Sequence, residues 1–332
     1  MTASIRDVAR RAQVSVGTVS NVLNTPEKVS PETRERVQSV IAQLGYVRND
    51  AARKLRNGQS HTIGLIVLNG TNPFFTEIAQ GAQNRALESG YTVLVGTSNE
   101  NVKRENTLLS LFAEQQVAGI LVSPTGDDLS PLCHLKDGKT PVVLVDRGAA
   151  NCAFSAVACD DIYGGEVAAE HLLGTGKRKI AFVGGPITSS QISDRWQGAA
   201  KAVLKVPDAT LRMIETTALT VTEGKRIGQE IAKLPVEKRP DAVFAANDLV
   251  ALGMLQSLVF AKDIRIPEDI AVIGYDDISY AEFAIVPLTT MRQPAEKIGA
   301  TSVELLLNAI ERPRDKTRQI TLKPELVVRA ST

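Results

Sequence analysis

The feature that most constrains the fold is an alternation of short apolar runs and helical stretches that starts at His61. Continuous apolar runs such as Val142–Val145 and Ile270–Ile273 are typical of central strands in parallel sheets, which are covered on both faces. Helical stretches of roughly 10–15 residues, such as Glu77–Ser89 and Leu249–Ala261, separate these runs. The pattern predicts a doubly wound α/β architecture.

The strand candidates form two series, which predicts two lobes that each hold a parallel sheet. The first series is Thr62–Leu68, Thr92–Gly96, Gly119–Ser123, Pro141–Asp146 and Ala156–Asp160, and the second is Lys179–Gly184, Arg212–Thr216, Asp241–Ala246 and Ile270–Tyr275. Three later segments can return to complete the lobes, namely Thr289–Gln293, a helix over Ala295–Ile310 and a strand over Gln319–Val328. We therefore expect one two-lobed domain over residues 61–332, with lobe 1 over about residues 61–161 and 291–322 and lobe 2 over about 162–290 and 323–332.

The segment Ser4–Asn24 predicts two short helices joined by a tight turn. Ser4 can cap the first helix with Asp7 reaching back to it, and Ser15 can cap the second. This arrangement is typical of a helix-turn-helix, and its outer face carries the basic residues Arg6, Arg10 and Arg11. On this stretch alone, an ordinary helical hairpin remains the alternative.

A third helix completes a three-helix domain over residues 1–48. Ser30 is placed to cap this helix, Pro31 takes the first helical position and Gly45 ends it. Residues 1–60 carry ten Lys or Arg and five Asp or Glu, whereas the other 272 residues carry 28 and 32. A basic amino-terminal domain on a slightly acidic body indicates that the small domain contacts a polyanion.

Residues 49–60 form a hinge between the two parts. Asn49 can cap a short helix that Gly58 closes, but a helix of this length is not stable alone in water. Leu55 is its only large apolar side chain, next to three cations. We expect a flexible linker in the free protein and a helix only on DNA.

Composition narrows the class of protein. The 332 residues are 43% hydrophobic, and no apolar run approaches the roughly 20 residues of a membrane span. The start of the chain lacks the apolar region of a secretory signal, and the three cysteines, Cys133, Cys152 and Cys159, form no C-x-x-C pair. We expect free thiols, no structural metal and a cytoplasmic protein.

Polar side chains gather where the predicted strands end, which is where ligands bind in open α/β sheets. Carboxylates, arginines and amides can hold the hydroxyls of a sugar, and an aromatic ring can stack on its C–H face. The residues that this rule selects are Asn72, Phe74, Phe75, Asp146, Arg147, Asp160, Asp161, Asp194, Arg195, Asn247, Asp248, Asp276, Asp277 and Gln293. One such residue alone is more often a strand-end cap, but their convergence favours a sugar site.

Two other classes of protein fit the sequence less well. An enzyme is disfavoured because Gly184-Gly185-Pro186 is not a G-x-G-x-x-G turn, and no P-loop, G-x-S-x-G motif or spaced metal ligands are present. A transport solute-binding protein would share the lobes, but it would lack residues 1–58 and need a signal peptide. Both stay as the less favoured alternatives.

The sequence resembles the lactose/galactose repressor (LacI/GalR) family over essentially its whole length. The motifs that carry the resemblance, in family order, are SIRDVARRAQVSVGTVSNVLN, VSPETRERVQSVIAQLGY, AARKLRNGQSHTIGLIV, NPFF, AANDLVALG, IPEDIAVIGYDDI and PLTTMRQP. The resemblance implies a homodimeric transcriptional regulator, expected to be a repressor, that binds a near-palindromic DNA operator. It also implies a two-lobe effector domain like that of periplasmic binding proteins, with no cofactor and no enzymatic activity.

For DNA binding, the resemblance places the helix Ser15–Leu23 in the major groove. Val16, Gly17 and Asn21 would read bases, although Gly17 departs from family members that carry a polar side chain there. Leu55 matches the hinge leucine that enters the minor groove and kinks the operator. The DNA-binding residues implied are Ser4, Arg6, Ser15, Val16, Gly17, Thr18, Ser20, Asn21, Asn24, Ala52, Arg53 and Leu55.

The predicted effector-binding residues resemble those of the ribose-binding periplasmic proteins more closely than those of the purine repressor. The Asp146-Arg147 pair supplies a fork of hydrogen-bonding groups for adjacent hydroxyls, which favours D-ribose or a ribose-containing metabolite such as a nucleoside. Leu219 falls where those relatives place an aromatic residue, and a purine or another sugar stays the alternative. The effector-binding residues implied are Asn72, Phe74, Phe75, Asp146, Arg147, Arg195, Leu219, Asn247, Asp276 and Gln293.

Overall fold

The protein consists of an amino-terminal unit, Met1–Ser60, and a larger unit, His61–Thr332. A computed structural model describes residues 3–46, 60–126, 128–138, 140–148, 153–261 and 263–332. The predicted hinge residues Ala52, Arg53 and Leu55 lie outside these ranges. Within them, no helix has both the length and the apolar character that spanning a bilayer requires.

The amino-terminal unit holds the three predicted helices around a small apolar core. The helices are α1 (Ile5–Ala12), α2 (Val16–Asn24) and α3 (Pro31–Leu44), with a short 3-10 turn η1 (Pro26–Lys28) before α3. Val8, Val19 and Val37, one from each helix, are fully buried and pack together. Such a core is small, so helix capping has to contribute to the stability of the unit.

The caps were predicted correctly for two of these helices and incorrectly for the third. Ser4 Oγ accepts from the Asp7 N–H at 3.3 Å while Asp7 Oδ2 accepts from the Ser4 N–H at 3.0 Å, which completes a capping box. Ser15 Oγ accepts from the Thr18 N–H at 3.0 Å. Ser30 precedes α3 as expected, but it makes no side-chain cap, because its hydroxyl donates to Thr33 Oγ1 at 3.0 Å instead.

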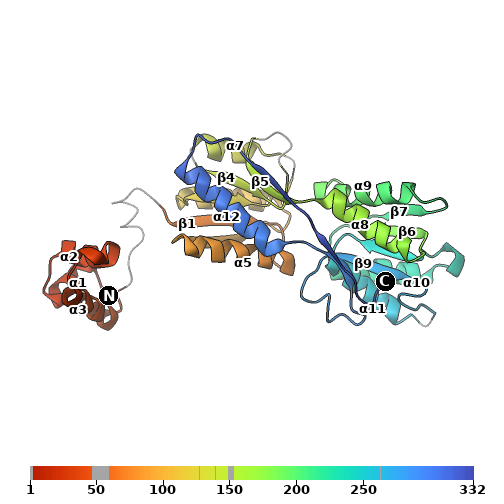
Figure 1. The fold of residues 1–332 in the computed structure, drawn as a ribbon, viewed down its shortest axis with the longest axis horizontal. Coiled ribbons are helices and arrows are strands. Elements are labelled where there is room, and N and C mark those ends of the chain that lie inside the picture. The colour runs from red at the N-terminus through yellow and green to blue at the C-terminus, as the bar shows by residue number, and fades with distance from the viewer. Residues whose placement is uncertain (1–2, 47–59, 127, 139, 149–152, 262) are drawn as a thin grey trace. The chain divides into compact units, whose positions relative to one another are not determined.

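Lobe 1 is a six-stranded parallel sheet in the order β11-β5-β4-β3-β1-β2, with helices on both faces (Figure 1). Its elements are β1 (Thr62–Val67), α5 (Pro73–Glu88), β2 (Thr92–Thr97), α6 (Val102–Glu114), β3 (Gly119–Val122), α7 (Ser130–Asp137), β4 (Val142–Val145), β5 (Ser155–Cys159), α12 (Ala295–Glu311) and β11 (Gln319–Leu322). Neighbouring residues of β1 point to opposite faces: Leu65 packs with α5 and α12, whereas Ile66 packs with Phe112 of α6. Burial on both faces explains the continuous apolar runs in the sequence.

Lobe 2 is a second six-stranded sheet in the order β12-β10-β9-β8-β6-β7, parallel except that β12 is antiparallel to β10. Its elements are α8 (Asp161–Gly174), β6 (Lys179–Val183), α9 (Ser190–Leu204), β7 (Thr210–Ile214), α10 (Val221–Lys233), a 3-10 turn η2 (Val236–Lys238), β8 (Ala242–Ala245), α11 (Asp248–Val259), β9 (Ala271–Asp276), β10 (Thr289–Arg292) and β12 (Glu325–Val327). Phe182 packs toward α8 and α9, and Val183 toward α10 and α11. The two doubly wound lobes that the sequence predicts are therefore present.

The chain passes between the lobes after β5, after β10 and after β11, and Figure 1 shows the carboxy-terminal segment running from one lobe to the other. The predicted single strand Gln319–Val328 is wrong. It is two strands, because β11 pairs with β5 in lobe 1 whereas β12 pairs with β10 in lobe 2. The break falls at Lys323-Pro324, and proline cannot donate a ladder hydrogen bond. The second strand of lobe 2, expected at Arg212–Thr216, begins two residues earlier, at Thr210, and ends at Ile214.

Candidate functional site

The helix α2 presents an exposed face that DNA can reach. Val16, Gly17 and Asn21 are exposed, whereas Val19 on the opposite side is buried in the small core. Gly17 and Asn21 lie four residues apart and therefore share one side of the helix. A Cβ at Gly17 would meet only Ser15 Oγ, at 3.5 Å, so packing does not require glycine there. The face can carry base contacts without disturbing the core.

The remaining predicted DNA contacts on the described residues surround this face. Ser4 and Arg6 are exposed at the start of α1, and Ser15 is exposed at the start of α2. Thr18 and Ser20 are half-buried, and Asn24 is the last residue of α2. The Ser15 hydroxyl, which caps α2, also lies within 2.9 Å of the Thr18 hydroxyl. These polar groups, at and near a helix N-terminus, are of the kind that positions a phosphate.

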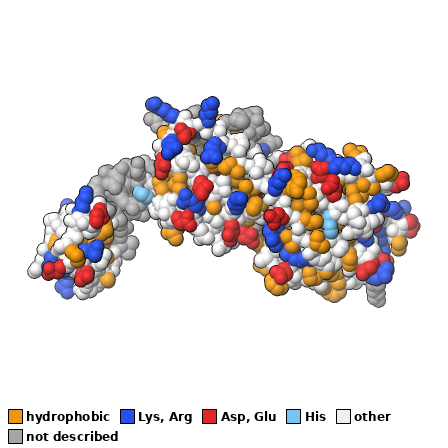
Figure 2. Space-filling model, viewed as in Figure 1, with side chains coloured by type: hydrophobic (Ala, Val, Ile, Leu, Met, Phe, Trp, Pro, Cys, Tyr) orange, Lys and Arg blue, Asp and Glu red, His pale blue; other side chains and the backbone are white. Residues whose placement is uncertain are grey.

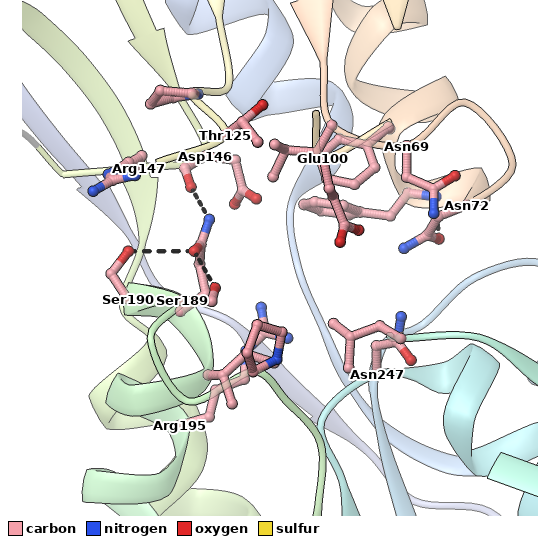
Figure 3. A pocket seen from close by; sticks show the side chains of 18 of the residues that line it. Asn69, Asn72, Glu100, Thr125, Asp146, Arg147, Ser189, Ser190, Arg195 and Asn247 are labelled. Carbon is pink, nitrogen blue, oxygen red and sulfur yellow. Dashed lines mark hydrogen bonds between the residues drawn. The ribbon is translucent and has the colours of Figure 1, made fainter. Parts of the chain in front are cut away.

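A cavity of about 310 Å³ lies between the lobes, where the strands of both sheets end. This volume is at the lower end of the roughly 300–1,000 Å³ typical of small-molecule sites. Figure 3 shows lobe 1 contributing Asn69, Asn72 and Glu100 from one side and lobe 2 contributing Arg195 and Asn247 from the other. All ten residues predicted for the effector line this cavity: Asn72, Phe74, Phe75, Asp146, Arg147, Arg195, Leu219, Asn247, Asp276 and Gln293.

Local backbone structure explains why these side chains face the cavity. Asn72 caps α5 by accepting from the Phe74 N–H at 3.1 Å, and Asn247 caps α11 by accepting from the Val250 N–H at 3.0 Å. Asp146 and Asp276, at the ends of their strands, have positive φ angles of 55° and 117°. Non-glycine residues adopt such angles at a cost, and they concentrate at functional sites. Both carboxylates are held at the cavity by this sharp turn of the chain.

Two hydrogen bonds connect the lobes across the cavity. Asn72 Nδ2 donates to Asp276 Oδ2 at 3.1 Å, which joins α5 of lobe 1 to β9 of lobe 2. Gln191 Nε2 of α9 donates to the Asp146 backbone carbonyl at 2.8 Å. Because both bonds involve residues that line the cavity, a ligand there can bias how the lobes sit on each other.

Arg195 is the buried cation of the cavity. Its Nε donates to Asp161 Oδ1 at 2.8 Å, its Nη1 donates to the Ala246 carbonyl at 2.6 Å, and its guanidinium lies 3.7 Å from the centre of the Tyr275 ring. Burial disfavours the charged guanidinium, but the Asp161 carboxylate, with Tyr275 and Asp276, outweighs burial and raises the pKa of Arg195. The side chain therefore stays charged and rigidly placed.

The carboxylates that face the cavity titrate far from their usual range. Burial raises the pKa of Asp276 to about 6, although Arg195 and the amides of Asn72 and Gln293 oppose this rise. Burial and repulsion from Asp161 raise the pKa of Asp146 well above its ordinary value, with Arg195 opposing. Burial also raises the pKa of Glu100. A ligand that donates a hydrogen bond to one of these carboxylates stabilises its ionised form.

Two buried acceptors that line the cavity have no hydrogen-bond partner. These are Asp146 Oδ1 and Gln293 Oε1, on residues that are 4% and 3% exposed. Buried polar atoms are nearly always paired, and an unpaired one costs about 1–3 kcal/mol. The pair therefore indicates a ligand that donates at least two hydrogen bonds, as a polyhydroxylated molecule does.

A metal site finds no support in the part of the chain that the structure describes, where no group of three or more His, Cys, Asp or Glu side chains is placed to hold an ion. Cys133 is an exposed free thiol and Cys159 a buried one.

The sequence reasoning missed several polar residues of the cavity. Glu100 follows β2, Thr125 follows β3, and Gln191 lies in the segment that follows β6. The rule that selected Asn72 and Asp146, namely polar residues after a strand, would have found them too.

The same rule also selected acidic residues that do not line the cavity, namely Asp160, Asp161, Asp194, Asp248 and Asp277. Asp160 caps α8 through the Tyr163 N–H at 3.0 Å, and Asp161 holds Arg195. Asp248 is fully buried and accepts from the Ile278 N–H at 2.8 Å, which fixes the loop after β9. These carboxylates support the site instead of facing a ligand.

Comparisons with known proteins identify the family to which the chain belongs. The family described as "Bacterial regulatory proteins, lacI family" matches residues 4–49, and the "Periplasmic binding protein-like domain" matches residues 169–332. The HTH-type transcriptional repressor PurR of Aliivibrio fischeri (strain ATCC 700601 / ES114) is 32% identical over 335 residues, covering 99% of this chain and 98% of that protein. The chain belongs to the lacI family.

Two further similarities extend over the whole lacI-family chain. The ribose operon repressor of Escherichia coli (strain K12) is 31% identical over 335 residues, which covers 99% of each chain. The crystal structure of the lac repressor dimer bound to operator and the anti-inducer ONPF is similar with a TM-score of 0.86 at 27% identity, covering 100% of this chain and 99% of that one. This lacI-family protein is a DNA-binding transcriptional regulator and not an enzyme.

Proposed function

We propose that this regulator represses transcription by binding a near-palindromic operator as a homodimer, and that D-ribose or a ribose-containing metabolite bound between the lobes controls that binding. It would act in the cytoplasm, on the nucleoid. The observation that carries the proposal is the pair of unpartnered buried acceptors, Asp146 Oδ1 and Gln293 Oε1, in a cavity of about 310 Å³. A small polyol supplies the missing donors, and Phe74 and Phe75 offer apolar surface for its C–H face.

Ribose is the first candidate because the acceptors of the cavity suit a small polyol. Asp146 Oδ1 and Gln293 Oε1 can each accept a hydrogen bond from a hydroxyl, and the Glu100 carboxylate lines the same cavity. The ribose operon repressor is also similar over 99% of its length. A purine is the second candidate, because PurR is similar to the same extent and the rings of Phe74 and Phe75 can stack on a base.

The homodimer is supported by apolar surface on lobe 2. Tyr280, Phe283 and Ile285, in the segment between β9 and β10, are 60%, 82% and 55% exposed, and Phe260 after α11 is 73% exposed. Aromatic residues are enriched where protein surfaces associate. Elsewhere on the face in view the two signs of charge are mixed (Figure 2), so no large field of one sign opposes association.

Thermodynamic linkage would couple effector binding between the lobes to operator binding by the amino-terminal unit. An effector that prefers one arrangement of the lobes would alter the spacing of the two hinges in the dimer, and hence their ability to order on DNA. A coupling of roughly 1–3 kcal/mol would change operator affinity by about 5–150-fold.

The deciding experiment is selection of bound DNA sites from a random pool, with and without D-ribose, other pentoses, nucleosides and free purines. We expect enrichment of a near-palindromic site and a change in its recovery with ribose or a ribonucleoside. A response to free purines alone would favour the second candidate. Enrichment of no site, or of one that no tested compound affects, would contradict the proposal.

Replacement of Leu55 by alanine tests the proposed hinge. We expect specific operator binding to weaken by about 100-fold or more while D-ribose affinity stays unchanged, because the leucine is proposed to insert between base pairs and kink the site. Fluorescence anisotropy with labelled operator measures the first quantity and calorimetry the second. Leu204→Ala is the control, since Leu204 is 86% exposed at the end of α9. Equal loss of both activities in Leu55→Ala would contradict a hinge role.

D-ribose affinity should depend on pH in a defined direction. Burial raises the pKa of Asp276 to about 6, so the carboxylate that accepts ligand hydroxyls is present above that pH and is lost below it. We expect affinity to fall by about tenfold for each pH unit below about 6, as measured by calorimetry. The same raised pKa means that the free protein gains stability from Asp276 as the pH falls through this range, so unfolding would not explain the loss. Constant affinity between about pH 7.5 and pH 5 would contradict the assignment.

A further inference from the structure

We propose that the cavity selects uncharged effectors against phosphorylated ones, and that Glu100 is a specificity-determining residue in this selection. The inference rests on the proposed function, since it names the class of ligand that the same cavity accepts.

The first observation is an excess of acidic over basic side chains among those lining the cavity. Glu100, Asp146 and Asp276 contribute three carboxylates, whereas Arg147 and Arg195 contribute two guanidinium groups. Arg195 is already paired with Asp161 at 2.8 Å and bound to the Ala246 carbonyl at 2.6 Å.

Arg147 is also engaged by the protein itself. Its Nη1 donates to the Gly126 carbonyl at 2.7 Å, and Figure 3 shows its side chain at the edge of the group, turned away from the centre of the cavity. Both guanidinium groups are therefore bound by protein acceptors, whereas Asp146 Oδ1 has no partner and the Glu100 carboxylate lines the same cavity. A phosphate group carries nearly two negative charges at neutral pH, so the acidic side chains that line the cavity would repel it.

The second observation concerns the N-terminus of α9, the place in the cavity where a phosphate would ordinarily bind. Ser189 and Ser190 precede and begin this helix, but both hydroxyls donate to Gln191 Oε1, at 3.0 and 3.3 Å. Gln191 Nε2 then donates to the Asp146 carbonyl at 2.8 Å, as Figure 3 shows. The two serine hydroxyls at this helix end are therefore used within the protein, and the lobe 1 residue that Gln191 contacts carries a carboxylate of its own.

The third observation is the placement of Glu100. Asn99 and Glu100 both adopt positive φ angles, 51° and 55°, and the Glu100 N–H donates to the Leu68 carbonyl at 3.2 Å. This turn aims the Glu100 side chain from lobe 1 into the space between the lobes, toward the side that carries Arg195 and Asn247 (Figure 3). A carboxylate there can accept a hydroxyl hydrogen bond and repels an anionic substituent.

The test measures binding of matched pairs that differ only by a phosphate: D-ribose and ribose 5-phosphate, fructose and fructose 1-phosphate, adenosine and AMP. Calorimetry on the full-length protein gives both affinities of each pair. The variants are Glu100→Gln, which keeps the shape and removes the charge, and Glu114→Gln as control. Glu114 is exposed at the opposite end of α6 and does not line the cavity.

For the wild-type protein we expect the uncharged member of any pair that binds to be favoured by at least about tenfold. Glu100→Gln should reduce that ratio by about tenfold, and Glu114→Gln should leave it unchanged. Equal or tighter binding of a phosphorylated member, or an unchanged ratio in Glu100→Gln, would overturn this inference but not the proposed function. Failure of every pair to bind would overturn both.

Discussion

Replacing Asp276 by alanine is expected to abolish the effector response while operator binding is retained. Its carboxylate accepts from Gln293 Nε2 at 2.8 Å and from Asn72 Nδ2 of the other lobe at 3.1 Å. Alanine leaves two buried amide donors unpaired, at about 1–3 kcal/mol each, and removes an acceptor from the cavity. We therefore expect D-ribose affinity to fall by at least about 100-fold.

The amino-terminal unit has its own core, so operator affinity without effector should stay within a few fold of wild type. Calorimetry measures the effector, and fluorescence anisotropy with labelled operator measures DNA binding in the presence and absence of D-ribose. Asp315→Ala is the control, because Asp315 is exposed in the turn after α12. A variant that still responds at wild-type D-ribose concentrations would exclude Asp276 from the binding site.

Replacing Arg195 by methionine is expected to cost roughly 3–5 kcal/mol of the free energy of unfolding. Asp161, 6% exposed, would then keep a buried charge without its partner. The Ala246 carbonyl would lose a donor and the Tyr275 ring a stacked cation. Urea unfolding of the full-length protein, followed through Trp196, measures the change.

The helix pair α8 and α9 also supplies the matched control. Lys205, after the other end of α9, pairs with Glu166 and Glu170 of α8, and all three are on the surface or near it. Lys205→Met should change stability little, because solvent screens exposed pairs. If Arg195→Met were no more destabilising than Lys205→Met, the buried pair would not have the role assigned to it.

A double variant separates stability from binding. Replacing Arg195 by methionine and Asp161 by leucine removes both charges, and apolar pairs of similar size often restore the stability that a single change loses. Because Arg195 also lines the cavity, Arg195→Met should weaken D-ribose binding as well. We expect the double variant to recover most of the lost stability but none of this D-ribose affinity. Recovery of both would show that Arg195 acts only through the fold.

Much of the fold was predictable because it depends on short stretches of sequence. The Ser4–Asp7 capping box joins residues three apart, and the apolar run Val142–Val145 is explained by burial on both faces of one sheet. The strand-end rule works for a similar reason: parallel strands all end at one edge, so Asp146 and Asn247 could be placed without knowing their partners. Gln319–Val328 was misread because its division depends on strands far away in the sequence.

By itself, the sequence indicated the helix-turn-helix and the two parallel-sheet lobes, since periodicity and capping are local properties. The strand-end rule and the family resemblance together selected ten of the residues that line the cavity. The tertiary structure alone decided which charged groups are paired within the protein and which remain available to a ligand. Arg195 meets Asp161 across 34 positions, and Asn72 meets Asp276 across 204. The unpaired Asp146 Oδ1 and the raised pKa of Asp276 likewise depend on burial and on neighbours that no local pattern records.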